Sequence, residues 1–198
     1  MTRVGVFGGT FDPVHVGHLA IAHAALESVP LDRVLFVLAK RSPLKERGPV
    51  ASEGDRLRML ELAVAGEPRF AVSRLELDRD GPSYTVDTLE RLAHLDRKDE
   101  LFLILGSDAI ADLPRWKDPD RIARLATLVV AERPGAPDRV GDAPIVRFDA
   151  PRLDISSREL RARAARGRSL RYLVPEPVLQ HIEARGLYRA EGPTSLTT

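Results

Sequence analysis

The sequence predicts an α/β protein built on one doubly wound, mostly parallel sheet with helices on both faces. Short apolar runs alternate with helical patterns along most of its 198 residues. Several of these runs are apolar without interruption, as in parallel strands that are covered on both faces. No internal repeat, low-complexity tract or linker divides the chain. We therefore expect one domain over residues 1–190 and a mobile C-terminal tail over residues 191–198.

The first half of the chain predicts two buried strands and two helices. Residues 4–7 and 34–38 have the apolar pattern of strands. Residues 16–28 form a helical pattern that Pro30 closes, and residues 52–65 form another that ends at Gly66. Residues 70–77 look extended, and the polar residues 78–82 with Gly81 and Pro82 predict a turn.

The second half continues the alternation. Residues 84–95 are expected to be helical, residues 101–105 and 127–131 to be buried strands, and residues 145–148 to be a shorter strand. Two helices over residues 157–166 and 177–185 close the chain, ahead of Gly167 and Gly186. Ligands of such sheets bind beyond the carboxyl ends of the strands, so the loops that follow strands are the places to look for a site.

Composition excludes several classes of protein. Lys plus Arg number 30 and Asp plus Glu 29, and this net charge of +1 argues against a general nucleic-acid coat protein. The absence of cysteine excludes disulfides, a thiol nucleophile and thiolate-bound metals. No apolar run approaches the ~18–20 residues that span a bilayer. The N-terminus reaches Gly5 and Gly8 too early for a signal peptide, and we expect a cytoplasmic protein with no membrane partner.

The loop after the first predicted strand has the features of a phosphate site. Gly8 and Gly9 permit a tight turn and close approach of a ligand, and the helix that follows offers unpaired amides to an anion. His15 and His18 are three residues apart and share one face of the first helical turn. The loop lacks the endings of a P-loop and of a dinucleotide-binding GxGxxG motif. Taken alone, a tight turn with packing or capping histidines explains it as well.

The combination of residues resembles a known signature. Gly8-Gly9-Thr10-Phe11-Asp12-Pro13 followed by His15-x-Gly17-His18 resembles the motif of the HxGH nucleotidyltransferases. Five further segments resemble one group of that superfamily, the bacterial nicotinate-nucleotide adenylyltransferases, and the resemblance runs from Val4 to about Tyr188. These segments are Ser83-Tyr84-Thr85-Val86-Asp87-Thr88-Leu89, Gly106-Ser107-Asp108 with Leu113 and Trp116, Glu132-Arg133-Pro134-Gly135, Ile155-Ser156-Ser157-Arg158-Glu159-Leu160-Arg161 and Tyr172-Leu173-Val174-Pro175.

Two positions depart from the pattern of that family. Leu44 stands where the family usually carries His in a Pro-His-Lys loop, although Lys45 keeps the amine. Arg158 stands where the family carries Thr, which puts a hydroxyl contact from that position in doubt.

The resemblance implies a Rossmann-like nucleotidyltransferase fold and transfer of AMP from ATP to nicotinate mononucleotide, giving deamido-NAD and pyrophosphate. Direct in-line attack of the acceptor phosphate needs no covalent enzyme intermediate, so the protein has to bring polyanions together and stabilise charge. His18 is expected at the α-phosphate and His15 at a neighbouring oxygen, where a protonated imidazole would help most although a helix N-terminus opposes that charge.

The implied catalytic residues are His18, His15, Lys45 and Arg161. The implied ATP-binding residues are Gly8, Gly9, Thr10, Phe11, His15, Gly17, His18, Gly106, Asp108, Ile155, Ser156, Ser157 and Arg161. The implied mononucleotide-binding residues are Thr10, Lys45, Tyr84, Thr85, Trp116 and Arg133.

Each of these residues has a structural alternative. Ser156 with Glu159 also reads as a helix capping box rather than a phosphate site. Trp116 is expected to stack on the pyridine ring, or else to fold against its own domain. The amides at Tyr84 and Thr85 would receive the nicotinate carboxylate, or Ser83 or Thr85 would cap the helix. Asp108 would hold a ribose hydroxyl or a magnesium-bound water, or cap a helix beginning at Ala109. Lys45 and Arg133 are candidates for the triphosphate and the mononucleotide phosphate respectively.

Residues 152–171 hold seven arginines and two acids, a local charge of +5. This run fits phosphate binding through Arg161, while Arg163, Arg166 and Arg168 are expected on a solvated face. No cluster of His, Asp and Glu would make a metal site of protein ligands alone, so Mg²⁺ is expected to arrive with ATP, bound mainly by phosphates and water. Three alternative functions stay open at this stage: use of nicotinamide mononucleotide, a non-catalytic nucleotide sensor, and nucleic-acid binding through the arginine run. The sequence leaves open whether the chain forms a homo-oligomer.

Overall fold

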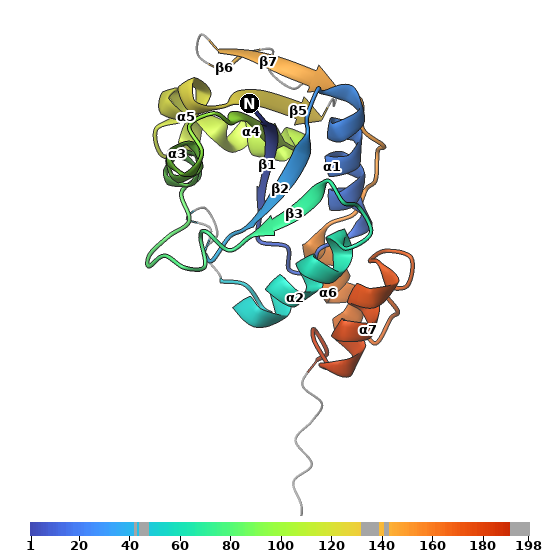
Figure 1. Cartoon of the computed structure of the whole chain (residues 1–198). Coiled ribbons are helices and arrows are strands. Elements are labelled where there is room, and N and C mark those ends of the chain that lie inside the picture. Colours follow the sequence, from blue (N-terminus) through green and yellow to red (C-terminus); the bar gives the residue numbers. More distant parts are fainter. Residues whose placement is uncertain (42, 44–47, 132–138, 141–142, 191–198) are drawn as a thin grey trace, which may run out of the picture.

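The computed structural model describes residues 1–41, 43, 48–131, 139–140 and 143–190. A seven-stranded sheet runs through the centre of the molecule (Figure 1). Its strands are β1 (Arg3–Gly9), β2 (Arg33–Leu38), β3 (Phe70–Ser73), β4 (Glu100–Leu105), β5 (Thr127–Ala131), β6 (Arg139–Val140) and β7 (Ala143–Phe148). The spatial order is β3-β2-β1-β4-β5-β7-β6, in which six strands are parallel and β6 pairs antiparallel with β7. The predicted fold class is confirmed.

The order of the strands places the site. The chain moves outward from β1 to β2 and β3, then returns to the other side of β1 to start β4. In such sheets a crevice opens at the carboxyl ends of the two strands where the direction of winding reverses, here β1 and β4. β1 ends at Gly9, and β4 ends one residue before Gly106.

Helices cover both faces of the sheet (Figure 1). On one face lie α1 (Val16–Ser28), α2 (Glu53–Val64), α6 (Ser157–Ala165) and α7 (Glu176–Ala184), and on the other lie α3 (Thr85–Leu95), α4 (Ser107–Asp112) and α5 (Pro119–Leu125), with a 3-10 turn η1 (Leu113–Arg115) between the last two. Successive side chains of a strand point to opposite faces, and β1 shows this alternation. Phe7 packs in the core under α1, whereas Val4 and Val6 pack in the core under α3 and α4.

Every predicted helix and strand occurs, with ends that lie within two residues of the prediction except in one strand, and several short elements were not predicted. The extended segment expected over residues 70–77 is a strand only to Ser73, because residues 74–78 close a turn in which the amides of Leu77 and Asp78 donate to the carbonyl of Arg74. The pattern also did not predict α5 or the two-residue strand β6, and a helix at the position of α4 was considered only as an alternative for Asp108. Elements of two to seven residues are too short to show a periodicity.

No helix in the described part of the chain is long and apolar enough to cross a membrane. The expected tail over residues 191–198 lies outside the described residues.

Candidate active site

A cavity of about 260 Å³ opens at the carboxyl ends of the central strands. Its walls come from β1 and the loop after it, from the end of β2, from the end of β4, and from the segments that carry Tyr84 and Trp116. Seven of the predicted site residues line it, namely Gly8, Gly9, Thr10, Tyr84, Thr85, Gly106 and Trp116. They are therefore gathered at one place in the fold although they span more than half of the chain.

One wall of the cavity is the N-terminus of α3. Tyr84 is the N-cap residue, and its side chain accepts no hydrogen bond from the first-turn amides. Ser83, one of the residues that could have capped the helix, is engaged elsewhere, because its Oγ accepts the amide of Lys40 at 3.0 Å. Among the described residues no side chain caps the amides at the start of α3, which lie beside the cavity at the positive end of the helix dipole.

Trp116 forms a second wall. It follows the η1 turn, whose Leu113 is fully buried and anchors the segment. The indole is half-buried, and its Nε1 is enclosed without a hydrogen-bond partner among the described residues. A tryptophan that lines a cavity with an unused donor is suited to a flat ligand that offers an acceptor.

Glu76 lines the same cavity and was not predicted. Its side chain is buried, and its Oε1 accepts the hydroxyl of Thr88 at 2.6 Å, while its Oε2 has no partner in the part of the chain that the structure describes. Arg115 and Lys117 also line the cavity, and Lys117 Nζ lies 2.8 Å from Asp87 Oδ1. Glu76 lies in a turn, Arg115 ends the three-residue η1 and Lys117 lies in the loop after it, so no local pattern marks them.

The loop after β1 is shaped by the packing of Phe11 over Gly9. A Cβ at Gly9 would lie 2.8 Å from the Phe11 ring, so only glycine allows this contact. Phe11 itself takes a φ of 46°, in the left-handed region, and its ring packs edge-on against Phe7 and tilted against Phe36 in the core. The Phe11 side chain is 2% exposed, so a contact of this residue with ATP would come from its main chain, and the ATP-binding role of Phe11 stays a prediction.

The two histidines differ in exposure. His15 is the N-cap residue of α1 and is 5% exposed, whereas His18 in the first turn is half-buried. Burial lowers the pKa of His15 from 6.5 to about 4, so this imidazole is neutral near pH 7. Burial thus opposes the protonated form that we expected to help at His15, and in the chain without a bound phosphate this imidazole is uncharged at neutral pH.

Gly17 explains the spacing of the motif. A Cβ at this position would lie 2.8 Å from Ile155 Cγ2 and 3.1 Å from His15 Nδ1. The His15 ring and Ile155 thus occupy the space above Gly17, and any larger residue would displace one of them. Ile155, a predicted ATP-binding residue, is brought to the same place as the histidine motif.

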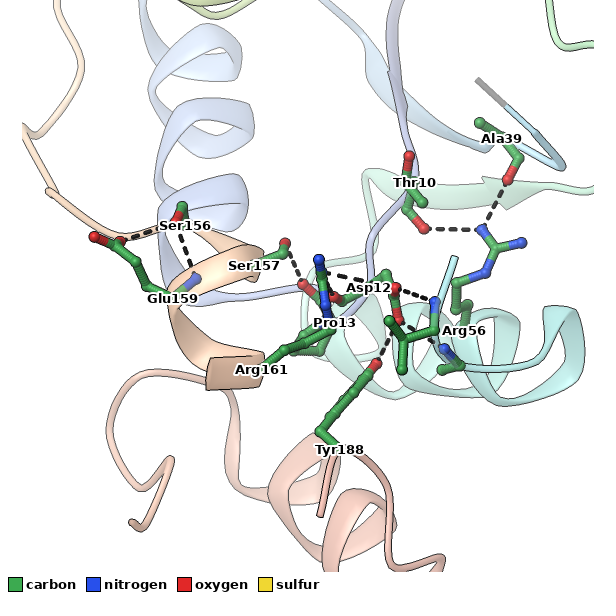
Figure 2. Close-up of polar contacts among 12 residues, drawn as sticks. Thr10, Asp12, Pro13, Ala39, Arg56, Ser156, Ser157, Glu159, Arg161 and Tyr188 are labelled. Atoms are coloured by element: carbon green, nitrogen blue, oxygen red, sulfur yellow. Dashed lines mark hydrogen bonds and ion pairs between the residues drawn. The ribbon is translucent and has the colours of Figure 1, made fainter. Parts of the chain in front are cut away.

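Asp12 joins this loop to three other parts of the fold (Figure 2). It is 3% exposed, and its carboxylate accepts the amides of Val50 at 2.7 Å and Ala51 at 3.1 Å, ahead of α2. It also accepts the hydroxyl of Tyr188, from the end of the described chain, at 2.8 Å. Sequence reasoning gave Asp12 no role, although an acid inside the motif was a signal that could have identified it.

The start of α6 packs against the same loop (Figure 2). Arg161 Nη1 donates to the Asp12 carbonyl at 2.6 Å and lies 3.7 Å from Asp12 Oδ2. Ser157 Oγ donates to the Pro13 carbonyl at 2.9 Å. Ser156 Oγ accepts the Glu159 amide at 3.2 Å and donates to the Glu159 carboxylate at 2.8 Å, so the capping alternative describes this residue. None of these three side chains lines the cavity.

Arg56 is fully buried and ties two loops of the site together (Figure 2). Its Nη1 donates to the carbonyl of Thr10 at 2.9 Å and to that of Ala39 at 2.7 Å, after β1 and β2 respectively. Burial of the Arg56 guanidinium lowers its pKa. The sequence did contain a signal, since Arg56 lies on the same helical face as Met59 and Leu60, where a charge is unexpected.

Some predicted residues lie outside the described part of the chain. Leu44, Lys45 and Arg133 are among them, so their positions stay predictions. Asp108 lies in α4, whose N-cap is Gly106, and its side chain is not among those described. Within the described residues no group of three or more His, Asp or Glu side chains could hold a metal ion.

Comparison with known proteins defines the class of the chain. The cytidylyltransferase-like family model matches residues 6–163. A Thermus thermophilus protein with the name "Probable nicotinate-nucleotide adenylyltransferase" is 53% identical over 187 residues, which cover 94% of this chain and all of that protein. A Roseiflexus castenholzii protein of the same name is 48% identical, with 94% of this chain and 98% of that protein covered.

Solved structures show the same fold. Nicotinic acid mononucleotide adenylyltransferase from Plasmodium falciparum superposes with a TM-score of 0.74 in its complex with NaAD and 0.73 in its complex with APC. Each match has 17% sequence identity and covers 95% of this chain and 98% of that chain. The chain thus has a nucleotidyltransferase fold. It belongs to the nicotinate-nucleotide adenylyltransferase family.

Proposed function

We propose that the chain transfers the adenylyl group of ATP to nicotinate mononucleotide, releasing deamido-NAD and pyrophosphate. In this reaction a phosphate oxygen of the mononucleotide attacks the α-phosphorus of ATP in line, and the bond from that phosphorus to the bridging oxygen of the β-phosphate breaks. The electron pair leaves with pyrophosphate, so no covalent enzyme intermediate is needed.

The cavity is the observation that carries the choice of acceptor. It brings an indole, Trp116, next to the uncapped amides of α3 at Tyr84 and Thr85. The indole can stack on a pyridine ring, and the amides can bind the carboxylate on that ring. The carboxamide of nicotinamide mononucleotide would bring its own N–H donors towards these main-chain N–H donors. The site therefore favours the acid over nicotinamide mononucleotide.

The loop over residues 10–18 and the start of α6 would bind ATP. His18 is the partly exposed imidazole of the pair, and we assign it to the α-phosphate. Arg161, which contacts Asp12 on this loop, and the first-turn amides of α6 would stabilise the charge of the triphosphate. Lys45 and Arg133 stay proposed phosphate ligands.

Mg²⁺ would enter the site with ATP. The described residues offer no cluster of carboxylates and imidazoles, which suits an ion that keeps phosphates and water as its main ligands. When bound, it would neutralise part of the charge on the phosphates.

Substitution of His18 tests the function. With ATP and nicotinate mononucleotide, His18→Ala should lower kcat about 100-fold or more with little change in either KM, as expected when one donor to the transition state is lost. His23→Ala is the matched control, since His23 is an exposed histidine on the same helix. Near-normal turnover of His18→Ala would contradict the assignment.

The stereochemistry at phosphorus tests the single displacement. With an ATP analogue made chiral by sulfur at the α-phosphate, one in-line attack inverts the configuration in the dinucleotide product. Retention would require two displacements and hence an adenylylated enzyme.

A further inference from the structure

A hydrogen bond from the main chain of His15 reaches the imidazole of His18. The backbone N–H of His15 donates to Nδ1 of His18 at a distance of 3.2 Å. Only an unprotonated Nδ1 can accept this bond. A neutral imidazole carries one N–H, so the proton of His18 then lies on Nε2.

The surroundings of the His18 ring oppose a positive charge. The His15 ring stacks on it with centroids 3.7 Å apart and an angle of 26° between the planes. The rings of Phe7 and Phe11 pack edge-on at 6.2 and 5.0 Å. Of these three neighbours only His15 can titrate, and its burial favours its neutral form. Among the other elements that pack against this loop, α6 contributes the positive charge of Arg161, which the nearby carboxylate of Asp12 partly balances.

The position of His18 in the helix acts in the same direction. It lies in the first turn of α1, and this turn holds no acidic residue. The positive end of a helix dipole favours the neutral form of an imidazole. Protonation of Nδ1 would also set two N–H groups against each other, since the His15 amide could no longer donate.

We propose that His15 is a positioning residue that holds His18 as the neutral Nε2–H tautomer, so that His18 meets the α-phosphate as an uncharged hydrogen-bond donor and not as an imidazolium. This inference rests on the proposed function for the identity of the phosphate. The main-chain amide of His15 sets the tautomer, and its stacked ring sets the plane of the His18 ring. Gly17 is part of the device because it leaves room for that ring. No proton is transferred in this role, and positive charge comes from Arg161 and the helix amides.

Nitrogen NMR of the full chain tests the tautomer directly. In protein labelled with ¹⁵N-histidine near neutral pH and without substrate, His18 should show a protonated Nε2 and a bare Nδ1. Comparison with His18→Gln assigns its signals among the five histidines of the sequence. An Nδ1–H tautomer or an imidazolium at this residue would overturn the proposal, whatever the activity of the protein.

Turnover provides the second readout. Between about pH 7 and pH 8.5 the kcat of the wild-type chain should stay level, whereas an imidazolium would lose its charge and its rate in the range where histidine titrates. His18→Gln keeps a neutral N–H donor near the position of Nε2, and His18→Lys supplies a permanent cation. We expect the Gln variant to be at least about 10-fold faster than the Lys variant. A Lys variant that is equal or faster, or a kcat that falls with rising pH, contradicts the inference.

The matched pair His23→Gln and His23→Lys, on the same helix, should keep wild-type rates. If the wild-type chain releases no pyrophosphate at any pH, the proposed function fails, while the NMR result still decides the tautomer.

Discussion

Trp116 is the residue on which the choice of acceptor most depends. Replacing it with alanine removes the flat wall of the cavity and leaves the loop over residues 10–18 unchanged. We expect Trp116→Ala to raise the KM for nicotinate mononucleotide by about 10-fold or more, as for the loss of one stacked ring, and to leave the KM for ATP within about twofold. Steady-state kinetics with each substrate varied in turn measures both constants. Leu95→Ala, at the exposed end of α3, controls for loss of an apolar surface side chain. Equal rises in both constants would contradict a role confined to the acceptor.

Gly17 provides a test of the histidine pair that leaves both imidazoles in place. A Cβ at Gly17 would lie 3.1 Å from His15 Nδ1 and 2.8 Å from Ile155 Cγ2, so Gly17→Ala must displace one of them. A misplacement of this kind should lower kcat by about 10- to 100-fold.

Gly54→Ala is the matched control for this change, because Gly54 is likewise the second residue of its helix and a Cβ there would meet nothing closer than 3.9 Å. It should keep the wild-type kcat and be neutral or slightly stabilising. A Gly17→Ala enzyme with normal kcat would show that the position of the His15 ring does not matter for turnover.

Among the elements, the buried carboxylate of Asp12 connects the loop after β1 with the segment ahead of α2, with Arg161 of α6 and with the end of the described chain. Tyr188→Phe removes one hydrogen bond to this carboxylate and keeps the ring. We expect a loss of about 1–3 kcal/mol in the free energy of unfolding, measured by urea denaturation, since a bond to a charged acceptor is lost and the site is buried. Tyr172→Phe removes a hydroxyl from an exposed ring and should change the free energy by less than about 0.5 kcal/mol. Equal effects of the two substitutions would contradict the role of Asp12.

The helices and strands differ in how well the sequence predicts them. The helix over residues 16–28 and the strand over residues 127–131 were predicted with their observed bounds, because each combines a clear apolar pattern with a clear end. In the region over residues 107–125, a helix at Ala109 was considered only as an alternative for Asp108 and the second helix was not expected, since the two helices are six and seven residues long and stand among prolines and aspartates. The site divides in the same way. The sequence predicts the site residues that lie within motifs, such as Thr10 and Trp116. It does not predict the positions of Glu76 and Arg56 in the site, because only tertiary packing brings them to the loops after β1 and β2.

For the whole molecule, the buried His15 links stability to pH. Its pKa in the folded chain is about 4, below the ordinary value of 6.5, so between these values the unfolded chain binds the proton more strongly. The stabilisation is therefore complete above about pH 6.5 and is lost as the pH falls towards 4, with a total of about 3 kcal/mol.

The stabilisation that depends on His15 and that which depends on Asp55 are lost in different pH ranges. The hydroxyl of Ser52, with smaller contributions from Arg185 and His181, lowers the pKa of Asp55 from 3.8, so its stabilisation is lost only at lower pH. Urea denaturation at a series of pH values should show the loss between about pH 6.5 and 4 in the wild-type chain and in His23→Asn. In His15→Asn the loss over this range should be smaller by about 3 kcal/mol. An unchanged slope in His15→Asn would contradict the assignment.

Positive and negative residues are distributed unevenly along the chain although its net charge is close to zero. Positive charge gathers in the run over residues 152–171, which begins ahead of α6 and includes the contact of Arg161 with Asp12, and acids elsewhere balance it. The Arg158, Arg166 and Arg168 side chains are exposed, and Arg163 donates to the Ser169 carbonyl at 2.6 Å. The arrangement fits a local site for phosphates on an otherwise balanced surface.

We propose that this cavity selects the acid mononucleotide as the acceptor of AMP. The most direct measurement is pyrophosphate release by the purified chain with ATP and Mg²⁺, comparing kcat/KM for nicotinate mononucleotide and nicotinamide mononucleotide. We predict release with the acid and a kcat/KM at least about 10-fold lower with the amide, equivalent to about 1.4 kcal/mol of discrimination by the amides of α3. Equal values for the two substrates, or a preference for the amide, would contradict the assignment of the carboxylate to those amides, and no release with either would contradict the proposed reaction.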